Sequence, residues 1–219
     1  MLKKIFSIYL EGWKITRKNL LFLIGILGGV FMFLELLTYL SNIAIDNLLI
    51  GIITSVLNVV FLCVFYLGLT KIFVKLSENE DIGFKDLFSQ WNQIGSIFIL
   101  YLFSIIVFYL LHRFFMFFAA TSGLPDLFAL IWLFCVTVIF ILFFSFINFS
   151  MVKYQMGPIS SLRYNFQVTK KDIFAVFIFY FLFLIINIIG LMVFYIGLII
   201  TLPITFLSQA IFLDKLEEF

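Results

Sequence analysis

Hydrophobic positions along this chain form long, uninterrupted runs, separated by shorter segments in which apolar and charged residues recur with helical spacing. An apolar helix of about 20 residues crosses the hydrocarbon core of a bilayer, whereas a barrel strand needs only about 10 residues of alternating polarity. Six runs reach the helical length: Asn19–Leu40, Asn47–Thr70, Gly95–Phe118, Leu127–Val152, Ile173–Leu191 and Phe194–Leu213. The pattern therefore predicts an all-α polytopic membrane protein with six transmembrane helices.

The last two runs are separated only by the segment from Gly190 to Gly197, in which no charged residue lies. This spacing fits a tight hairpin of two crossing helices, and it also fits a broken, re-entrant pair. The sequence leaves both arrangements open.

Three shorter amphipathic segments each precede two of the apolar runs. They cover Leu2–Lys18, Phe84–Ile94 and Pro158–Lys171, and they carry aromatic residues at corresponding places, Trp13, Trp91 and Phe166. Such segments are typical of helices that lie in the membrane interface, with basic residues toward the headgroups and aromatic residues at the acyl boundary. We expect three interfacial helices that anchor the spans behind them; lipid sensing or the docking of a partner is the alternative interpretation.

Helical spacing divides these segments into two faces. In the first segment the predicted apolar face consists of Leu2, Ile5, Phe6, Tyr9 and Trp13. In the third segment Ile159, Leu162 and Phe166 are predicted to be apolar, opposite the polar residues Ser161, Arg163 and Lys170.

The recurring order of one amphipathic segment and two spans suggests an internal repeat within a single transmembrane domain, residues 1–219. The units would be 1–76, 77–153 and 154–219. Parallel units would be related by an axis along the membrane normal, unlike the inverted repeats of many transporters. Residue identity between the units is slight, and any protein with six spans divides into hairpins, so both interpretations stay open.

Composition and charge support membrane insertion and set an orientation. The 219 residues are 64% hydrophobic and 12% charged, whereas a soluble domain is about 25% charged. With six spans, all of the 14 basic residues except Arg113 fall on one side. Because cytoplasmic loops are enriched in Lys and Arg, we expect an inner-membrane protein with both termini in the cytoplasm.

Residues that carry chemistry are scarce. The single histidine, His112, has no nucleophile arranged around it, and no glycine-rich phosphate loop appears. Cys63 and Cys135 lie inside spans without other metal ligands nearby in sequence, so we interpret them as packing residues. A net charge of +2 gives no support for nucleic-acid binding. We expect no catalytic, cofactor or metal site, and we expect that the protein is not an enzyme.

Glu35 and Arg113 are the ionisable pair inside the predicted spans, and intramembrane charges usually have a function or a partner. Glu35 lies about 22 Å beyond Leu20, and Arg113 about 25 Å beyond Ser96, at the helical rise per residue. Both therefore fall near the outer interface. They are predicted to form an ion pair between the first and third spans, with His112 as a polar neighbour; separate snorkelling is the alternative.

Other polar residues inside the spans are expected to hydrogen-bond between helices: Asn58, Asn148, Asn187, Thr201 and Gln209. Gly25 and Gly29 form a small-residue motif that would let another helix approach closely, within one chain or in a dimer.

The last third of the chain contains Gly157-Pro158-Ile159-Ser160-Ser161, then Val168-Thr169-Lys170-Lys171, then Gly190 and Gly197-Leu198-Ile199-Ile200-Thr201-Leu202-Pro203. This pattern resembles the YciC-like bacterial integral membrane proteins and the membrane domain attached to some glycerophosphodiester phosphodiesterases. The resemblance implies a helical inner-membrane protein. It does not imply phosphodiesterase activity, because the catalytic domain of those enzymes is a separate soluble unit.

Two functions remain open. A non-catalytic scaffold or accessory subunit would contact membrane lipids, a partner membrane protein or a second copy. A small transporter or permease subunit would need several polar residues that converge near the middle of the membrane. The polar residues here are scattered Asn and Thr, which favours the scaffold.

Overall fold

The computed structural model describes residues 1–43, 48–122, 126–193 and 196–216, and within these ranges the chain is helical with no β-strand. The long helices in chain order are α1 (Leu2–Lys18), α2 (Leu20–Ile43), α3 (Leu48–Ser77), α4 (Ile94–Ser122), α5 (Asp126–Phe144), α7 (Pro158–Lys171), α8 (Ile173–Met192) and α9 (Ile196–Lys215). Three shorter helices are η2 (Phe84–Phe88), η3 (Trp91–Gln93) and α6 (Ile147–Tyr154). The predicted all-α fold is confirmed.

Five helices in the described ranges are long and apolar enough to cross a membrane: Leu20–Ile43, Leu49–Ser77, Phe84–Phe117, Ile173–Met192 and Gly197–Lys215. The protein is therefore a multi-pass membrane protein. The predicted span Leu127–Val152 is wrong as a single helix, because α5 ends at Phe144 and α6 begins at Ile147. The count of six spans stays a prediction.

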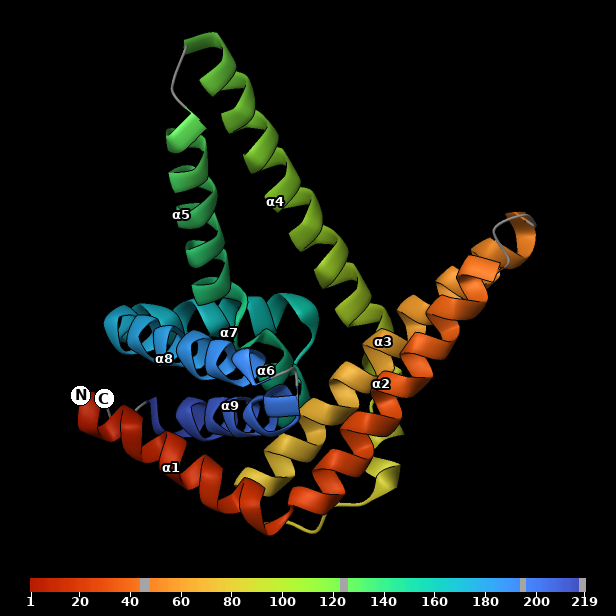
Figure 1. Ribbon diagram of the computed structural model, residues 1–219. Coiled ribbons are helices and arrows are strands. Elements are labelled where there is room, and N and C mark those ends of the chain that lie inside the picture. The colour runs from red at the N-terminus through yellow and green to blue at the C-terminus, as the bar shows by residue number, and fades with distance from the viewer. Residues whose placement is uncertain (44–47, 123–125, 194–195, 217–219) are drawn as a thin grey trace.

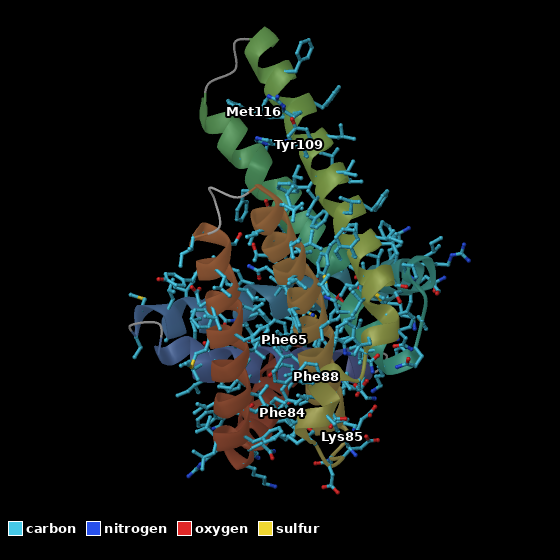
Figure 2. All side chains as sticks on the ribbon, turned by 90° about the vertical axis from the view of Figure 1, so that its right-hand side faces the viewer. Phe65, Phe84, Lys85, Phe88, Tyr109 and Met116 are labelled. Carbon is cyan, nitrogen blue, oxygen red and sulfur yellow. The ribbon has the colours of Figure 1, made fainter. Side chains whose placement is uncertain are left out.

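Three helical hairpins leave a common base in three different directions: α2/α3, α4/α5 and α8/α9 (Figure 1). Figure 2 shows this base around Phe84 and Lys85, with Tyr109 and Met116 far above it on the outer half of α4. An amphipathic element precedes each hairpin, namely α1, the pair η2 and η3, and α7. The division of the chain into three repeated units stays a prediction.

Helix α9 lies at the centre of the base, between α8, α1 and α3 (Figure 1). Half of its span is buried within the protein, against 17–22% in the other four spans. The core of the protein is therefore built around α9, and the other hairpins present most of their apolar surface outward.

The α8/α9 hairpin is tight because glycines let the two helices approach each other. A Cβ atom at Gly197 would overlap the backbone of Gly190, and one at Gly190 would overlap the side chain of Thr201. Of the two arrangements left open by the sequence, the structure contains two complete helices packed as a tight hairpin.

The second amphipathic segment differs from the helix predicted for it, since η2 and η3 are short 3-10 helices. The Asp86 carboxylate accepts a hydrogen bond from the Gly83 N–H at 2.8 Å and pairs with Lys75 at 2.9 Å. Phe88 packs against Phe65 with ring centroids 5.8 Å apart (Figure 2). These contacts hold the segment as tight turns against α3 rather than as one α-helix.

Candidate functional site

The helix is interrupted between the end of α5 and the start of α6, and this helix break is surrounded by the other elements. The Ser145 carbonyl accepts a hydrogen bond from Gln209 Nε2 at 2.7 Å. The Phe146 N–H donates to Asn165 Oδ1 at 2.9 Å. Unpaired backbone groups at membrane depth cost several kcal/mol each. Side chains of α9 and α7 therefore allow α5 to end where the apolar sequence alone would continue a helix.

Further polar side chains converge on this break from the surrounding helices. Asn148 Nδ2 donates to the Tyr66 hydroxyl at 3.0 Å and approaches the Tyr101 hydroxyl at 3.4 Å. Gln209 Nε2 also donates to the Tyr180 hydroxyl at 2.6 Å. We call this group the polar hub; it consists of Tyr66, Tyr101, Ser145, Asn148, Asn165, Tyr180 and Gln209. It joins α3, α4, α6, α7, α8 and α9.

A column of stacked rings connects α1 to the hub. Tyr9 stacks on Phe179 with centroids 5.0 Å apart, Phe179 on Phe212 at 4.3 Å, and Phe212 on Phe146 at 5.9 Å. The Tyr9 hydroxyl donates to the Phe179 carbonyl at 2.8 Å. Stacked aromatic pairs add stability beyond the area that they bury, so the column fixes α1, α8 and α9 around the break.

The polar hub holds helices together. Its side chains are amides, phenols and one serine. The amides of Asn148 and Gln209 donate to hydroxyl or carbonyl oxygens of neighbouring elements, and the Asn165 amide oxygen accepts from the Phe146 N–H. The interhelical role predicted for Asn148 and Gln209 is confirmed. It is also confirmed for Asn187, which donates to Thr205 at 3.1 Å, and for Asn58, which donates to Thr38 at 2.9 Å. The prediction is wrong for Thr201, whose hydroxyl is buried without a hydrogen-bond partner among the described residues.

Ion pairs connect the three units at the base. Lys153 pairs with Glu78 at 2.9 Å and with Asp214. Lys215 of α9 pairs with Glu11 of α1 at 2.6 Å. Partial burial lowers the pKa of Lys153, but its hydrogen bonds with Asp214 and Glu78 outweigh this effect and raise the pKa above its ordinary value. Lys153 is therefore a charged link between the end of α3, α6 and the end of α9.

A groove lies between α4 and α5. Its wider part has a volume of about 350 Å³ and is lined by Tyr101, Ser104, Ile105, Phe108, Tyr109, His112 and Phe140. A narrower part of about 60 Å³ shares Tyr101, Ser104 and Phe140 and continues to Asn148 of the hub. The Nδ1 atom of His112 is buried in this region, and no described residue forms a hydrogen bond with it.

The predicted partners Glu35 and Arg113 are not brought together. They are exposed side chains on α2 and α4, which belong to hairpins that diverge (Figure 1). Arg113 Nε donates to the Tyr109 hydroxyl at 3.0 Å, and the guanidinium lies 5.6 Å from the Tyr109 ring centre. Both residues lie in described ranges, and no ion pair joins them there. His112, the predicted polar neighbour, lines the groove.

The three predicted anchors are exposed at the base: Trp13 to 39%, Trp91 to 52% and Phe166 to 40%. Helix α1 has three sectors rather than two faces. Ile5, Ile8, Tyr9, Gly12 and Thr16 are buried against the protein. Leu2, Phe6, Leu10 and Trp13 form an outward apolar sector. Lys3, Ser7, Glu11, Lys14 and Lys18 form a charged sector on the remaining side.

Helix α7 has the same three sectors, in the same rotational order along the helix. Its buried side consists of Ser161, Asn165, Val168 and Thr169. Ile159 and Phe166 are exposed, beside Arg163 and Lys170. The prediction that Ser161 lies on the outward polar face is wrong, because Ser161 is fully buried on the side of α7 that packs against the protein. The sequence offers no signal for this, since the partners come from distant elements.

Fold and site together define a multi-pass, all-α integral membrane protein whose centre is a bonded polar hub. A comparison of the chain with protein-family models, with curated proteins and with solved structures finds no match. Of the two cysteines predicted to pack inside spans, Cys63 is buried beside the hub. The side chain of Cys135 lies outside the described residues.

Proposed function

We propose that this protein is a non-catalytic scaffold or accessory subunit of the bacterial inner membrane that contacts lipids or a partner protein. The observation that carries the proposal is that the buried polar residues hydrogen-bond to other parts of the protein. Gln209 and Asn165 satisfy the backbone at the helix break, and Asn148 bridges two tyrosines. Because these polar groups already hydrogen-bond within the protein, they stabilise the packing of the hairpins. A transport path needs polar groups that can bind a substrate instead.

The amphipathic elements support a role at the membrane surface. On α1 and α7 an outward apolar sector lies between the protein and a charged sector. That order suits a helix at the interface, where one side contacts acyl chains and the next faces headgroups and water. Trp13, Trp91 and Phe166 would anchor the three units at this depth.

We place both termini in the cytoplasm. The ion pair between Glu11 and Lys215 brings the first and last helices to the same end of the protein. Nearly all basic residues belong to segments of that end, which favours the cytoplasmic side. The resemblance of residues 157–203 to YciC-like proteins supports the same location.

A thiol-accessibility experiment tests this function. Cys135→Ala leaves Cys63, which is 3% exposed, as the single thiol of the chain. In sealed membrane vesicles of either orientation, a membrane-impermeant thiol reagent is expected to leave Cys63 unlabelled. The matched control adds Ser7→Cys in the charged sector of α1, which is expected to react only when the cytoplasmic face is outside. Rapid labelling of Cys63 in intact, folded protein would contradict the scaffold and favour a small transporter or permease subunit.

A further inference from the structure

The groove between α4 and α5 follows α4 away from the base, from Tyr101 to His112. With α4 crossing the bilayer from Ile94, the depth of each groove residue follows from its distance along the helix. Ser104 lies about 15 Å along α4 from Ile94, and His112 about 27 Å, at the rise of 1.5 Å per residue. The hydrocarbon core is about 30 Å thick. Ser104 therefore falls near the midplane, and His112 falls near the outer interface.

The walls of the groove are mainly apolar along this length. Ile105, Phe108 and Phe140 line its wider part, and polar groups occur chiefly at its ends. At the inner end, Tyr101 and Asn148 are close enough to hydrogen-bond with each other. A water molecule needs two or more polar partners to be held in a cavity, so the middle of the groove suits a hydrocarbon chain.

A buried polar atom lies at the outer end of the groove, and a cation lies beside it. Among the residues that the structure describes, His112 Nδ1 has no hydrogen-bond partner. Arg113 donates through Nε to Tyr109, whose ring lines the groove. A guanidinium has five N–H donors and binds phosphate oxygens well. No carboxylate pairs with Arg113 in the ranges that the structure describes.

We propose that the groove between α4 and α5 binds one anionic phospholipid of the outer half of the bilayer. Its phosphate would lie at Arg113, its ester region beside His112, and one acyl chain in the groove toward Ser104. The charge of Arg113 selects an anionic headgroup, and the apolar walls select the chain. Binding at this site requires only membrane insertion, and its assignment to the outer half of the bilayer rests on the proposed cytoplasmic position of the base.

Trp132 provides a reporter for this site. It belongs to α5 and stacks on Phe115 with ring centres 4.7 Å apart, and Phe115 is one helical turn beyond His112. The variant Trp13→Phe/Trp91→Phe leaves Trp132 as the only tryptophan, since the chain has three. Brominated acyl chains quench tryptophan fluorescence on contact. Reconstitution in phosphatidylcholine vesicles with a small, equal fraction of brominated phosphatidylglycerol or brominated phosphatidylcholine compares the two headgroups directly.

We expect brominated phosphatidylglycerol to quench Trp132 about threefold more effectively at equal fraction, a preference typical of a partly screened charge pair. Arg113→Gln should abolish this preference while leaving quenching by phosphatidylcholine intact. The matched control, Arg163→Gln, removes an exposed arginine from α7 and should preserve it.

Filling the groove tests the second half of the proposal. Ser104→Phe places a ring in the groove and should remove the preference for phosphatidylglycerol, while Ile106→Phe on the exposed side of α4 should preserve it. Gel filtration of each variant confirms that it is folded. Equal quenching by both lipids in the parent protein would overturn the proposal. So would weak quenching by both, which would mean that protein, such as a second copy, covers the groove.

Discussion

At the scale of single residues, glycines decide where elements meet at backbone distance. A Cβ atom at Gly68 of α3 would overlap the Leu87 backbone of η2. The predicted close-approach motif on α2 behaves differently, since a Cβ at Gly25 or Gly29 meets nothing within 4 Å in this structure. A motif of small residues thus permits close helix packing, but the tertiary fold determines at which glycines two elements actually meet.

We predict that alanine changes the stability of the protein in opposite directions at a closely packed glycine and at a glycine with open space around it. Gly68→Ala should destabilise the protein by about 1–3 kcal/mol, because the methyl group overlaps backbone that can move only with η2. Gly25→Ala should leave stability unchanged or raise it by up to about 1 kcal/mol, since alanine favours the helix. Thermal unfolding in detergent, followed by gel filtration, measures both. A Gly25→Ala loss as large as that of Gly68→Ala would contradict the assigned packing.

The hydrogen bonds at the helix break lead to a second residue-scale prediction. Gln209→Leu leaves the Ser145 carbonyl and the Tyr180 hydroxyl without this donor. The expected loss of stability is about 1–2 kcal/mol, because two hydrogen bonds are lost and a typical one contributes about 1 kcal/mol. Gln167→Leu, on the exposed side of α7, is the matched control and should have little effect. Equal thermal stability of the two variants would show that the break is held by other contacts.

At the scale of elements, most helices follow from the apolar runs, and the exceptions have tertiary causes. Nothing near Ser145 resembles a helix terminator, because the segment has neither Gly nor Pro. The break depends on Asn165 and on Gln209, the latter 64 residues away in the chain. The three sectors of α1 and α7 were missed for a related reason. A two-face pattern cannot distinguish an apolar residue that packs on protein from one that faces lipid.

The outward sectors lead to a prediction about depth. In a Trp91→Phe/Trp132→Phe variant, Trp13 is the single tryptophan and belongs to the outward apolar sector of α1. Lipids brominated near the headgroup end of the acyl chain should quench it more strongly than lipids brominated near the chain terminus. An interfacial tryptophan has this profile. Stronger quenching by the deeper bromines would place α1 inside the hydrocarbon core and contradict its role as an anchor.

At the scale of the whole molecule, three hairpins diverge from one base, so the contacts of the base hold the architecture together (Figure 1). The aromatic column and the polar hub join the hairpins inside, and Lys153 joins them at the surface of the base. The sequence indicated which segments lie at this base. It could not indicate the partners of Lys153, because Glu78 lies at the opposite end of the same unit and Asp214 belongs to another unit.

The link through Lys153 gives the last prediction. Because its pKa is raised, the ammonium stays charged and the link is complete at neutral pH; it is lost only as the pH rises through that raised value. Lys153→Glu should cost about 1 kcal/mol or more, since three carboxylates would then meet at the base. Lys14→Glu, at an exposed lysine of α1, is the control for charge alone. Adding Asp214→Lys to Lys153→Glu restores an opposite charge, so thermal stability should recover in the double variant. If the double variant is no more stable than Lys153→Glu alone, the units are held by the hub and the aromatic column without help from this ion pair.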